Sequence, residues 1–459
     1  MSADPVARIL SEWAADIPTP GSDLASNRAL DALTDGLACI FAGCNNPVTL
    51  KVLKAAVKSH GQGHHTVFGH RTTLPATAAA LVNGMAAHAL DFDDNFLPGL
   101  THATATLAPA LIAAAESQQV TGRRLIDAYV IGLELQARIG ALVNPQHYER
   151  GWHATSTIGT IGTAGAVATL LALPPRQIAA AMCIAFSLAG GSKLQFGSEV
   201  KPLHAGFAAH NAVLAAHLAA AEVGTHAEFL TGPWSFQDLY CPPPGNNPKD
   251  ALNDLGQRWA IEEYGLLAKR FPCCAASHKA LDAIEMLVRD HRVTLDSLTR
   301  VTAFLPTPLH QNLRFDSPRT ESEARFSFSY PAARLMQEGH LSLQHFTTDA
   351  VMEEVIQKAL PLFIREAVQT GPKGVHVPVR VIAEFKSGKN IEIEVSDVQG
   401  GPNAPLSKSV LERKIEDCLD WSGTSENAPM FKKMAALHEL DDIRKLTRSE
   451  KKKDSVGLH

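Results

Sequence analysis

Apolar segments of helix length recur along the first two-thirds of the chain, and they limit the possible fold more than any other feature of the sequence. Turn residues separate these segments, and several of them are apolar nearly all round, which is typical of helices buried inside a large all-α domain. We therefore expect a mainly α protein. The Ala-rich segments occupy residues 76–90, 104–116, 125–141, 157–173, 177–189 and 204–223.

The stretch 154–173 carries no charged residue, and its length alone would permit a membrane span. It is rich in Gly, Ser and Thr and only weakly hydrophobic. We therefore expect a buried helix here, and no membrane among the partners of the protein. The N-terminal sequence contains acidic residues and has no apolar core of the signal-peptide type, so we expect no export signal.

The pattern changes after residue 266. Residues 300–306 are strand-like, and residues 379–395 alternate on both sides of "KSGK", which predicts a β-hairpin. Helical patterns lie between them at 321–337 and 348–359. A linker follows at 399–405, after which the helical pattern returns.

These boundaries predict a large all-α helical domain into which a smaller α+β domain is inserted. The helical domain comprises residues 1–265 and 403–459, and the α+β domain comprises residues 266–402.

Charge and cysteine content narrow the partners and the compartment. The formal net charge is -5, which argues against nucleic acid as a partner. Charged residues make up only 19% of the chain, so we expect surface to be hidden in a homo-oligomer, most simply a homodimer. The seven cysteines are odd in number and show no C-x-x-C spacing, which indicates a reducing, cytoplasmic compartment.

The segment "HALDFDD" concentrates titratable groups inside an apolar region. Its residues His88, Asp91, Asp93 and Asp94 offer the donor atoms of a metal site, but no second spaced ligand group occurs elsewhere in the chain. We therefore expect no metal. The segment is then either a solvated loop between two buried helices or the floor of an active site. We expect Asp93 and Asp94 to cap a helix or face solvent.

Four further segments place a cationic or titratable side chain among small apolar residues. Each has a structural explanation of its own, because a histidine in an apolar helix is usually part of the core and a tyrosine among aromatics usually packs. Buried cations are costly unless paired, however. If the fold brings them to one cavity, a ligand with two or three carboxylates would pair them. The residues are His102, His153, Lys201 with His204, and Lys269 with Arg270 and His278; Tyr330 lies in an aromatic setting.

Several motifs, taken in order, resemble the MmgE/PrpD family over nearly the whole chain. They are "NGMAAHALDFDD", "GWHATSTIGTIGTAGA", "KPLHAGFAAHNAVLAA", "KRFPCCAASHKALDA" and "EARFSFSYPAA". The family includes 2-methylcitrate dehydratase, cis-aconitate decarboxylase and iminodisuccinate epimerase. The resemblance implies a helical domain with a smaller α+β lid domain, a homodimer, small polycarboxylate substrates, and an active site between the domains that uses neither metal nor cofactor.

The family's pattern falls on Asp91, His102, His153, Lys201, Lys269 and Tyr330. We assign His102 and His153 as an acid/base pair, because imidazole titrates near neutral pH. Asp91 would orient a histidine or act as base, and Tyr330 would position substrate or relay a proton. We expect substrate carboxylates to be bound by Lys201 and Lys269, with Arg270 and His278 from the same segment as Lys269.

Two departures from the decarboxylases of the family leave the reaction open. Asn95 stands where they have Thr, and Cys274 stands where they have His. We expect a lyase that removes a proton next to a carboxylate, either by dehydration or with decarboxylation. The alternatives are an epimerase of the iminodisuccinate type and, from another class, a helical protein that binds polycarboxylates without catalysis.

Overall fold

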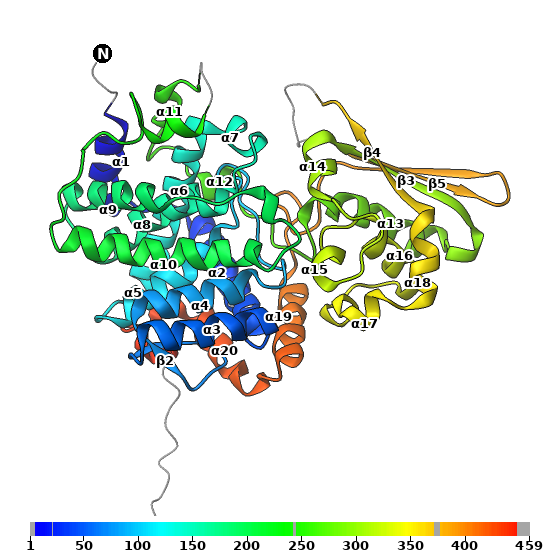
Figure 1. Cartoon of the computed structure of the whole chain (residues 1–459), viewed down its shortest axis with the longest axis horizontal. Coiled ribbons are helices and arrows are strands. Elements are labelled where there is room, and N and C mark those ends of the chain that lie inside the picture. The colour runs from blue at the N-terminus through cyan, green and yellow to red at the C-terminus, as the bar shows by residue number, and fades with distance from the viewer. Residues whose placement is uncertain (1–4, 21, 242–244, 371–376, 448–459) are drawn as a thin grey trace, which may run out of the picture.

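The chain folds into a helical lobe and a smaller lobe that carries a sheet, and each lobe has its own hydrophobic core (Figure 1). The computed structural model describes residues 5–20, 22–241, 245–370 and 377–447. The core of the helical lobe draws on residues 6–261 and 418–446, with Leu343 added from the smaller lobe. The core of the smaller lobe draws on residues 271–395. The mainly α fold predicted from the sequence is confirmed.

The helical lobe is formed first by the N-terminal half of the chain. Its elements are α1 (Val6–Ala15), α2 (Asp23–Cys44), α3 (Pro47–His60), a two-stranded ribbon of β1 (His65–Thr66) and β2 (Thr73–Leu74), α4 (Ala76–His88), α5 (Ala103–Glu116), α6 (Gly122–Val143), α7 (Gln146–Glu149), α8 (Ile158–Leu170), α9 (Pro175–Leu188), α10 (Val200–Ala220), α11 (Phe236–Tyr240) and α12 (Ala260–Glu263). The C-terminal part of the chain returns to this lobe as α19 (Lys408–Ser422), α20 (Ala428–Ala435) and α21 (Arg444–Thr447), with α19 packed against α2.

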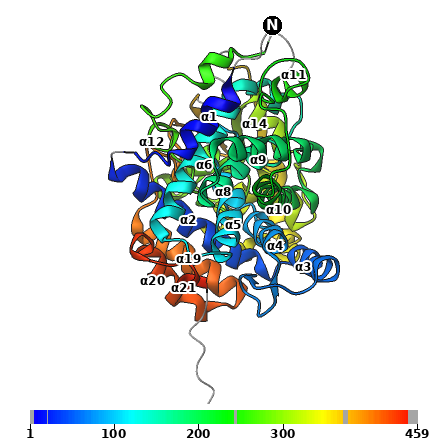
Figure 2. The same cartoon turned by 90° about the vertical axis from the view of Figure 1, so that its left-hand side faces the viewer.

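Helix α8 is the centre of the helical lobe. All 13 of its residues are buried, and α5, α6, α9 and α10 contact it (Figure 2). The uncharged stretch at 154–173 therefore forms a core helix, as expected. Among the described residues no single helix is both long and apolar enough to cross a membrane, and one bent pair, α2 with α3, passes that test of length and composition jointly.

Helices α4 and α10 approach each other closely because glycine stands at their crossing. A Cβ atom at Gly206 would lie 2.5 Å from the carbonyl oxygen of Leu81, and one at Gly84 would lie 3.0 Å from that of Ala205. Backbones this close leave no room for side chains between them. The crossing brings the C-terminal end of α4, where His88 lies, beside the first turns of α10.

The smaller lobe contains a four-stranded sheet covered by short helices. Its strands, in the spatial order β4-β3-β5-β6, are β4 (Phe363–Val368), β3 (Leu298–Pro306), β5 (Val379–Phe385) and β6 (Asn390–Val395). β3 runs parallel to β4 and antiparallel to β5, and the predicted hairpin is β5–β6, with Val381 opposite Ile393. The helices are α13 (His278–His291), α14 (Thr307–Asn312), α15 (Glu321–Ala324), α16 (Ser329–Glu338), α17 (Thr348–Val351) and α18 (Glu354–Ala359), and Figure 1 shows α13 and α16 beside the sheet.

Two helices expected in this lobe are interrupted. The pattern at 321–337 forms α15 and α16, separated at residues 325–328, where Arg325 turns inward and donates to the carbonyl oxygens of Leu90 and Pro272. The pattern at 348–359 forms α17 and α18 with a break at Met352 and Glu353. The edge strand β4 was not expected from the sequence.

Candidate active site

Three buried cations hold three consecutive carbonyl oxygens in the acidic loop, which we define as residues 89–94 after α4. The cations come from distant parts of the chain, and we call the set the backbone clamp. Asp91, in the middle of the acidic loop, has a φ of 50°, a left-handed conformation that is uncommon for a residue other than glycine. The three hydrogen bonds run from Arg325 Nη1 to Leu90 O (2.8 Å), from Lys269 Nζ to Asp91 O (2.8 Å) and from Lys414 Nζ to Phe92 O (2.9 Å).

Lys414, on α19, connects this clamp to two other segments. Its Nζ also donates to Lys269 O at 2.9 Å and lies 2.6 Å from Asp35 Oδ1 on α2. Burial lowers the pKa of Lys414, but the carboxylate of Asp35 outweighs it and the net pKa lies above the usual value. The ammonium therefore stays charged, donates to two carbonyl oxygens and pairs with the carboxylate of Asp35.

The carboxylate of Asp91 lies between two lysines. Asp91 Oδ1 is 2.5 Å from Lys201 Nζ and 3.1 Å from Lys269 Nζ. Burial alone would raise the pKa of Asp91, but the two ammonium groups outweigh burial and hold it below its usual range. Asp91 is therefore ionised and a weak base. Two ammonium groups thus face Asp91, and the ionised carboxylate of the nearby Asp93 balances the second of them.

Asp93 is shared by two histidine rings. His88 Nδ1 lies 2.8 Å from Asp93 Oδ1, and His102 Nδ1 lies 3.2 Å from Asp93 Oδ2. An imidazole whose Nδ1 hydrogen faces a carboxylate presents Nε2 as an acceptor. Asp93 thus occupies the orienting position that the sequence had left to Asp91, and the expectation that Asp93 faces solvent is wrong, because its side chain is fully buried.

Burial keeps these imidazoles uncharged. It lowers the pKa of His102 to about 3, in spite of the opposing effect of Asp93. Burial, followed by the charge of Lys201, holds the pKa of His153 well below its usual value. Both rings are therefore uncharged at neutral pH, and they are weak bases as long as no anion lies beside them.

His153 is linked to a histidine of α10. Its Nδ1 lies 2.9 Å from Nδ1 of His204, so one of these atoms carries the hydrogen and the other accepts it. When His153 Nδ1 carries the hydrogen, its Nε2 is a base; when His204 supplies it, that Nε2 is a donor. The Nε2 atoms of His88 and His153 are buried and have no hydrogen-bond partner among the described residues.

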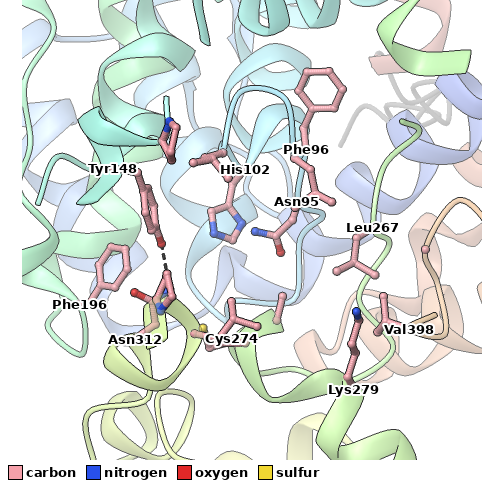
Figure 3. A pocket seen from close by; sticks show the side chains of 18 of the residues that line it. Asn95, Phe96, His102, Tyr148, Phe196, Leu267, Cys274, Lys279, Asn312 and Val398 are labelled. Carbon is pink, nitrogen blue, oxygen red and sulfur yellow. Dashed lines mark hydrogen bonds between the residues drawn. The ribbon is translucent and has the colours of Figure 1, made fainter. Parts of the chain in front are cut away.

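A cavity of about 520 Å³ opens above these groups, between the two lobes (Figure 3). His102, His153 and Lys201 reach its surface, together with Asn95 and Cys274. Across one side, the amide of Asn312 donates to the hydroxyl of Tyr148 at 3.0 Å and joins the lobes.

Of the residues proposed from the sequence, five meet at this cavity or directly beneath it: Asp91, His102, His153, Lys201 and Lys269. Asp91 and Lys269 lie one layer behind the lining, where they support Lys201.

Three other proposed residues lie elsewhere. Tyr330 is fully buried in the core of the smaller lobe, and its hydroxyl donates to the carbonyl oxygen of His345. Arg270 forms ion pairs within the smaller lobe, with Asp282 at 2.7 Å and Glu285 at 2.9 Å. His278 Nε2 lies 3.2 Å from the carbonyl oxygen of Cys273. None of the three lines the cavity, because each is engaged inside the smaller lobe.

Asp94 supports the beginning of α5. Its carboxyl accepts a hydrogen bond from the backbone nitrogen of Thr104 at 3.3 Å and another from the Thr104 hydroxyl, so the expected capping role holds, although the side chain is buried. Burial raises the pKa of Asp94 to about 7, and Asp93 and Asp35 add to the rise.

The donor atoms of a metal site are present in the same cluster. One ligand atom from each of His88, Asp91, Asp93 and His102 lies within 4.8 Å of the others. The ammonium groups of Lys201 and Lys269 adjoin Asp91, however, and would repel a divalent cation. Lys201, which reaches the cavity surface, therefore favours an anion at its own position.

His88, His204 and Lys414 had no acid/base or supporting role assigned from the sequence, and Asp93 was expected only to cap a helix or face solvent. A signal existed for His204, which lies three residues after Lys201 and so on the same face of a helix. No spacing rule relates Lys414 to the acidic loop, since 322 residues separate it from Phe92.

Known proteins match the chain along most of its length. The MmgE/PrpD N-terminal domain matches residues 8–249, and the MmgE/PrpD C-terminal domain matches residues 271–440. A cis-aconitate decarboxylase of Homo sapiens is 28% identical over 390 residues, which cover 82% of this chain and 79% of that protein. A cis-aconitate decarboxylase of Aspergillus terreus is 26% identical over 433 residues, which cover 88% of this chain and 87% of that protein.

Proposed function

Because this chain belongs to the MmgE/PrpD family, we propose that it is a lyase that removes a proton next to a carboxylate of a small di- or tricarboxylate. The observation that carries the proposal is that uncharged imidazoles, those of His102 and His153, and the ammonium group of Lys201 meet at one cavity. Removing an α-proton creates negative charge next to a carboxylate, and fixed donors in a dry site stabilise such charge without reorganising.

Lys201 is the cation that meets the substrate. Its ammonium lies at the cavity surface and is held from behind by Asp91. A substrate carboxylate at this position would be paired with Lys201 and would also raise the proton affinity of His102 and His153, because a nearby anion favours the imidazolium.

Elimination is the first candidate. The uncharged His102 can accept the α-proton, and His153, in the tautomer whose Nε2 is a donor, can protonate the hydroxide that leaves. Decarboxylation needs only a donor that protonates the carbanion left when carbon dioxide departs. Cys274, which stands where the resemblance implies histidine in the decarboxylases, lines the cavity, and burial raises the pKa of its thiol. Decarboxylation is the second candidate, and the names of the relatives favour it; epimerisation and binding without catalysis are further alternatives.

Proton NMR in deuterated water tests these alternatives in one experiment. The purified protein is incubated with citrate, 2-methylcitrate, cis-aconitate and iminodisuccinate, each with and without a chelator. Elimination predicts loss of the proton next to a carboxylate and an unsaturated product, which has an olefinic signal when citrate is the substrate. Decarboxylation predicts a product that carries deuterium in place of the lost carboxyl group, and epimerisation predicts exchange without net loss. Absence of any exchange with every compound would contradict the proposal and favour a binding protein. A loss of activity with chelator alone would identify a metal requirement.

The Lys201→Ala variant tests the carboxylate contact. We expect the Michaelis constant to rise because the variant removes the cation at the cavity surface, and Lys201→Arg should restore part of the binding. An unchanged Michaelis constant for every substrate turned over would contradict this role.

We also propose a cytoplasmic homodimer. No disulfide joins two cysteines among the described residues, which suits a reducing compartment. Exposed apolar side chains lie on α10 (Phe207, 42% exposed) and α3 (Leu50, also 42%), helices that the Lys51–Glu199 ion pair connects. Light scattering should give twice the chain mass, and Phe207→Asp should shift it toward one chain; a monomeric wild-type protein would contradict the dimer.

A further inference from the structure

Tyr148 lines the cavity from the helical lobe, where it lies on α7 (Figure 3). Its hydroxyl accepts a hydrogen bond of 3.0 Å from the amide nitrogen of Asn312, which ends α14 in the smaller lobe. A phenol oxygen that accepts from an amide nitrogen keeps its own hydrogen for another partner. Among the described residues the Tyr148 hydroxyl has no acceptor for that hydrogen, so a ligand in the cavity can supply one.

Asn312 is a costly side chain if it serves only as a contact between the lobes. Its amide oxygen is buried and has no hydrogen-bond partner among the residues that the structure describes, and such an atom lowers stability. A leucine of similar size would fill this position without that cost. The amide nitrogen, however, can donate to Tyr148 and leave the hydroxyl hydrogen free, whereas a carboxylate in its place would take that hydrogen. Asn312 thus leaves the hydroxyl as a donor.

The Tyr148 ring is also held from within the helical lobe. The ammonium of Lys193 lies 3.7 Å from the ring centroid and donates to the carbonyl oxygen of Tyr148 at 3.4 Å. Two backbone hydrogen bonds hold the segment that continues to His153. They run from Lys193 N to Gly151 O (2.8 Å) and from His153 N to Gly191 O (3.0 Å). The hydroxyl and the imidazole are therefore fixed relative to each other, as a donor that acts without reorganisation requires.

We propose that the Tyr148 hydroxyl donates a hydrogen bond to the substrate carboxylate on which negative charge develops, and that Asn312 is the positioning residue for this hydroxyl. The inference rests on the proposed function. Lys201 pairs with a carboxylate before the reaction, whereas a neutral donor binds more strongly as the charge on its acceptor grows, so Tyr148 acts mainly in the transition state. Burial raises the pKa of Tyr148, and Cys274 and Asp91 add to the rise. The hydroxyl therefore keeps its proton, and no bond forms or breaks at its oxygen.

The Tyr148→Phe variant tests the proposal because it removes only the hydroxyl. Kinetics are measured with citrate, 2-methylcitrate, cis-aconitate or iminodisuccinate, whichever the wild-type protein turns over. We expect kcat to fall by about 10- to 100-fold, the effect of losing a hydrogen bond to a charged group, and the Michaelis constant to stay within about threefold. The matched control is Tyr240→Phe, which removes a hydroxyl that donates to Ala189 O at 2.7 Å outside the cavity. A kcat within about twofold of the wild type in Tyr148→Phe would overturn the proposal, and so would a change confined to the Michaelis constant.

The Asn312→Leu variant separates the chemical role from the contact between the lobes. It removes the same hydrogen bond between the lobes as Tyr148→Phe does, but it keeps the hydroxyl. We therefore expect kcat to fall by less than about fivefold, as for the loss of a hydrogen bond between neutral groups. Equal losses of kcat in the two variants would overturn the proposal, because the pair would then only hold the lobes together.

The pH dependence of kcat supplies a further measurement. Its shape should be the same in Tyr148→Phe and in the wild type, because a hydroxyl that keeps its proton adds no titration. Loss of an alkaline limb in the variant would show that Tyr148 transfers a proton, and it would overturn the donor role. A wild-type protein that exchanges no proton with any of the four compounds would instead contradict the proposed function, and the role of Tyr148 with it.

Discussion

Replacement of Lys414 by methionine should disable the site without touching the cavity. The variant removes the donor to Phe92 O and to Lys269 O, both at 2.9 Å, and leaves Asp35 as a buried carboxylate without its ion pair. Loss of one partner of a buried pair costs about 3–5 kcal/mol. That is a large share of the roughly 5–15 kcal/mol that stabilises a folded protein, so the melting temperature should fall clearly.

The double variant Asp35→Asn/Lys414→Met separates positioning from stability. It removes both charges, and such replacements are often neutral for stability. The carbonyl oxygen of Phe92 still lacks its donor, so the acidic loop can shift. A displacement of about 1 Å in a reacting geometry can cost about a hundredfold in rate.

We therefore expect the double variant to recover most of the melting temperature but to exchange substrate protons about a hundredfold more slowly, with a Michaelis constant close to that of the wild type. Deuterium incorporation by NMR and thermal melting measure the two effects, and Lys414→Arg should restore part of the rate. The control is Glu134→Gln/Arg138→Met, which removes another ion pair of the helical lobe, one that has no contact with the acidic loop. Wild-type exchange rates in the Asp35→Asn/Lys414→Met variant would refute the reasoning.

Four further predictions concern single side chains. His153→Ala should lower kcat by about a hundredfold or more, the usual contribution of a positioned acid or base, and a rate near that of the wild type would remove it from the mechanism. Asp93→Asn should lower kcat by a similar factor because the amide can hold His88 or His102 in the wrong tautomer; unchanged kinetics would exclude an orienting role. Asp94→Asn should make the melting temperature less dependent on pH. The carboxyl of Asp94 keeps its proton to about pH 7 in the native protein and loses it near 3.8 in the unfolded chain, so the wild-type melting temperature should fall as pH rises across that interval. An equally steep fall in the variant would contradict the raised pKa of the buried carboxyl. Tyr330→Phe removes only the hydrogen bond to His345 O, so it should cost about 1 kcal/mol of stability and leave kcat within about twofold, whereas a hundredfold loss would show that the hydroxyl reaches the substrate.

Local patterns predicted the helices well, because burial of apolar side chains with helical spacing is a short-range property. The helices α4, α5, α6, α8, α9 and α10 all lie where the sequence indicated them, with bounds shifted by a few residues. The breaks at Arg325 and Met352 were missed. At Arg325 the helix ends where the guanidinium donates to Leu90 O of the other lobe, and such a long-range contact leaves no periodic pattern in the sequence. The edge strand β4 was missed for a related reason, because its pairing with β3 is a long-range property.

The candidate site shows the same division. The residue types and the small-residue context pointed to His102, His153 and Lys201, all of which reach the cavity. Spacing could not separate the roles of Asp91 and Asp93, which lie two residues apart in one loop and turn toward different partners, the first toward lysines and the second toward imidazoles. That choice depends on the left-handed backbone at Asp91, which only coordinates reveal.

The backbone clamp depends on a residue that is synthesised late. During synthesis, His102, His153 and Lys201 leave the ribosome long before Lys414, which follows Phe92 by 322 residues. A nascent chain, or one cleaved by a protease before α19, would carry these side chains without Lys414, the member of the backbone clamp that binds Phe92 O. Only a chain that includes α19 joins all three carbonyl oxygens to their cations, so we expect a product that ends before α19 to lack activity.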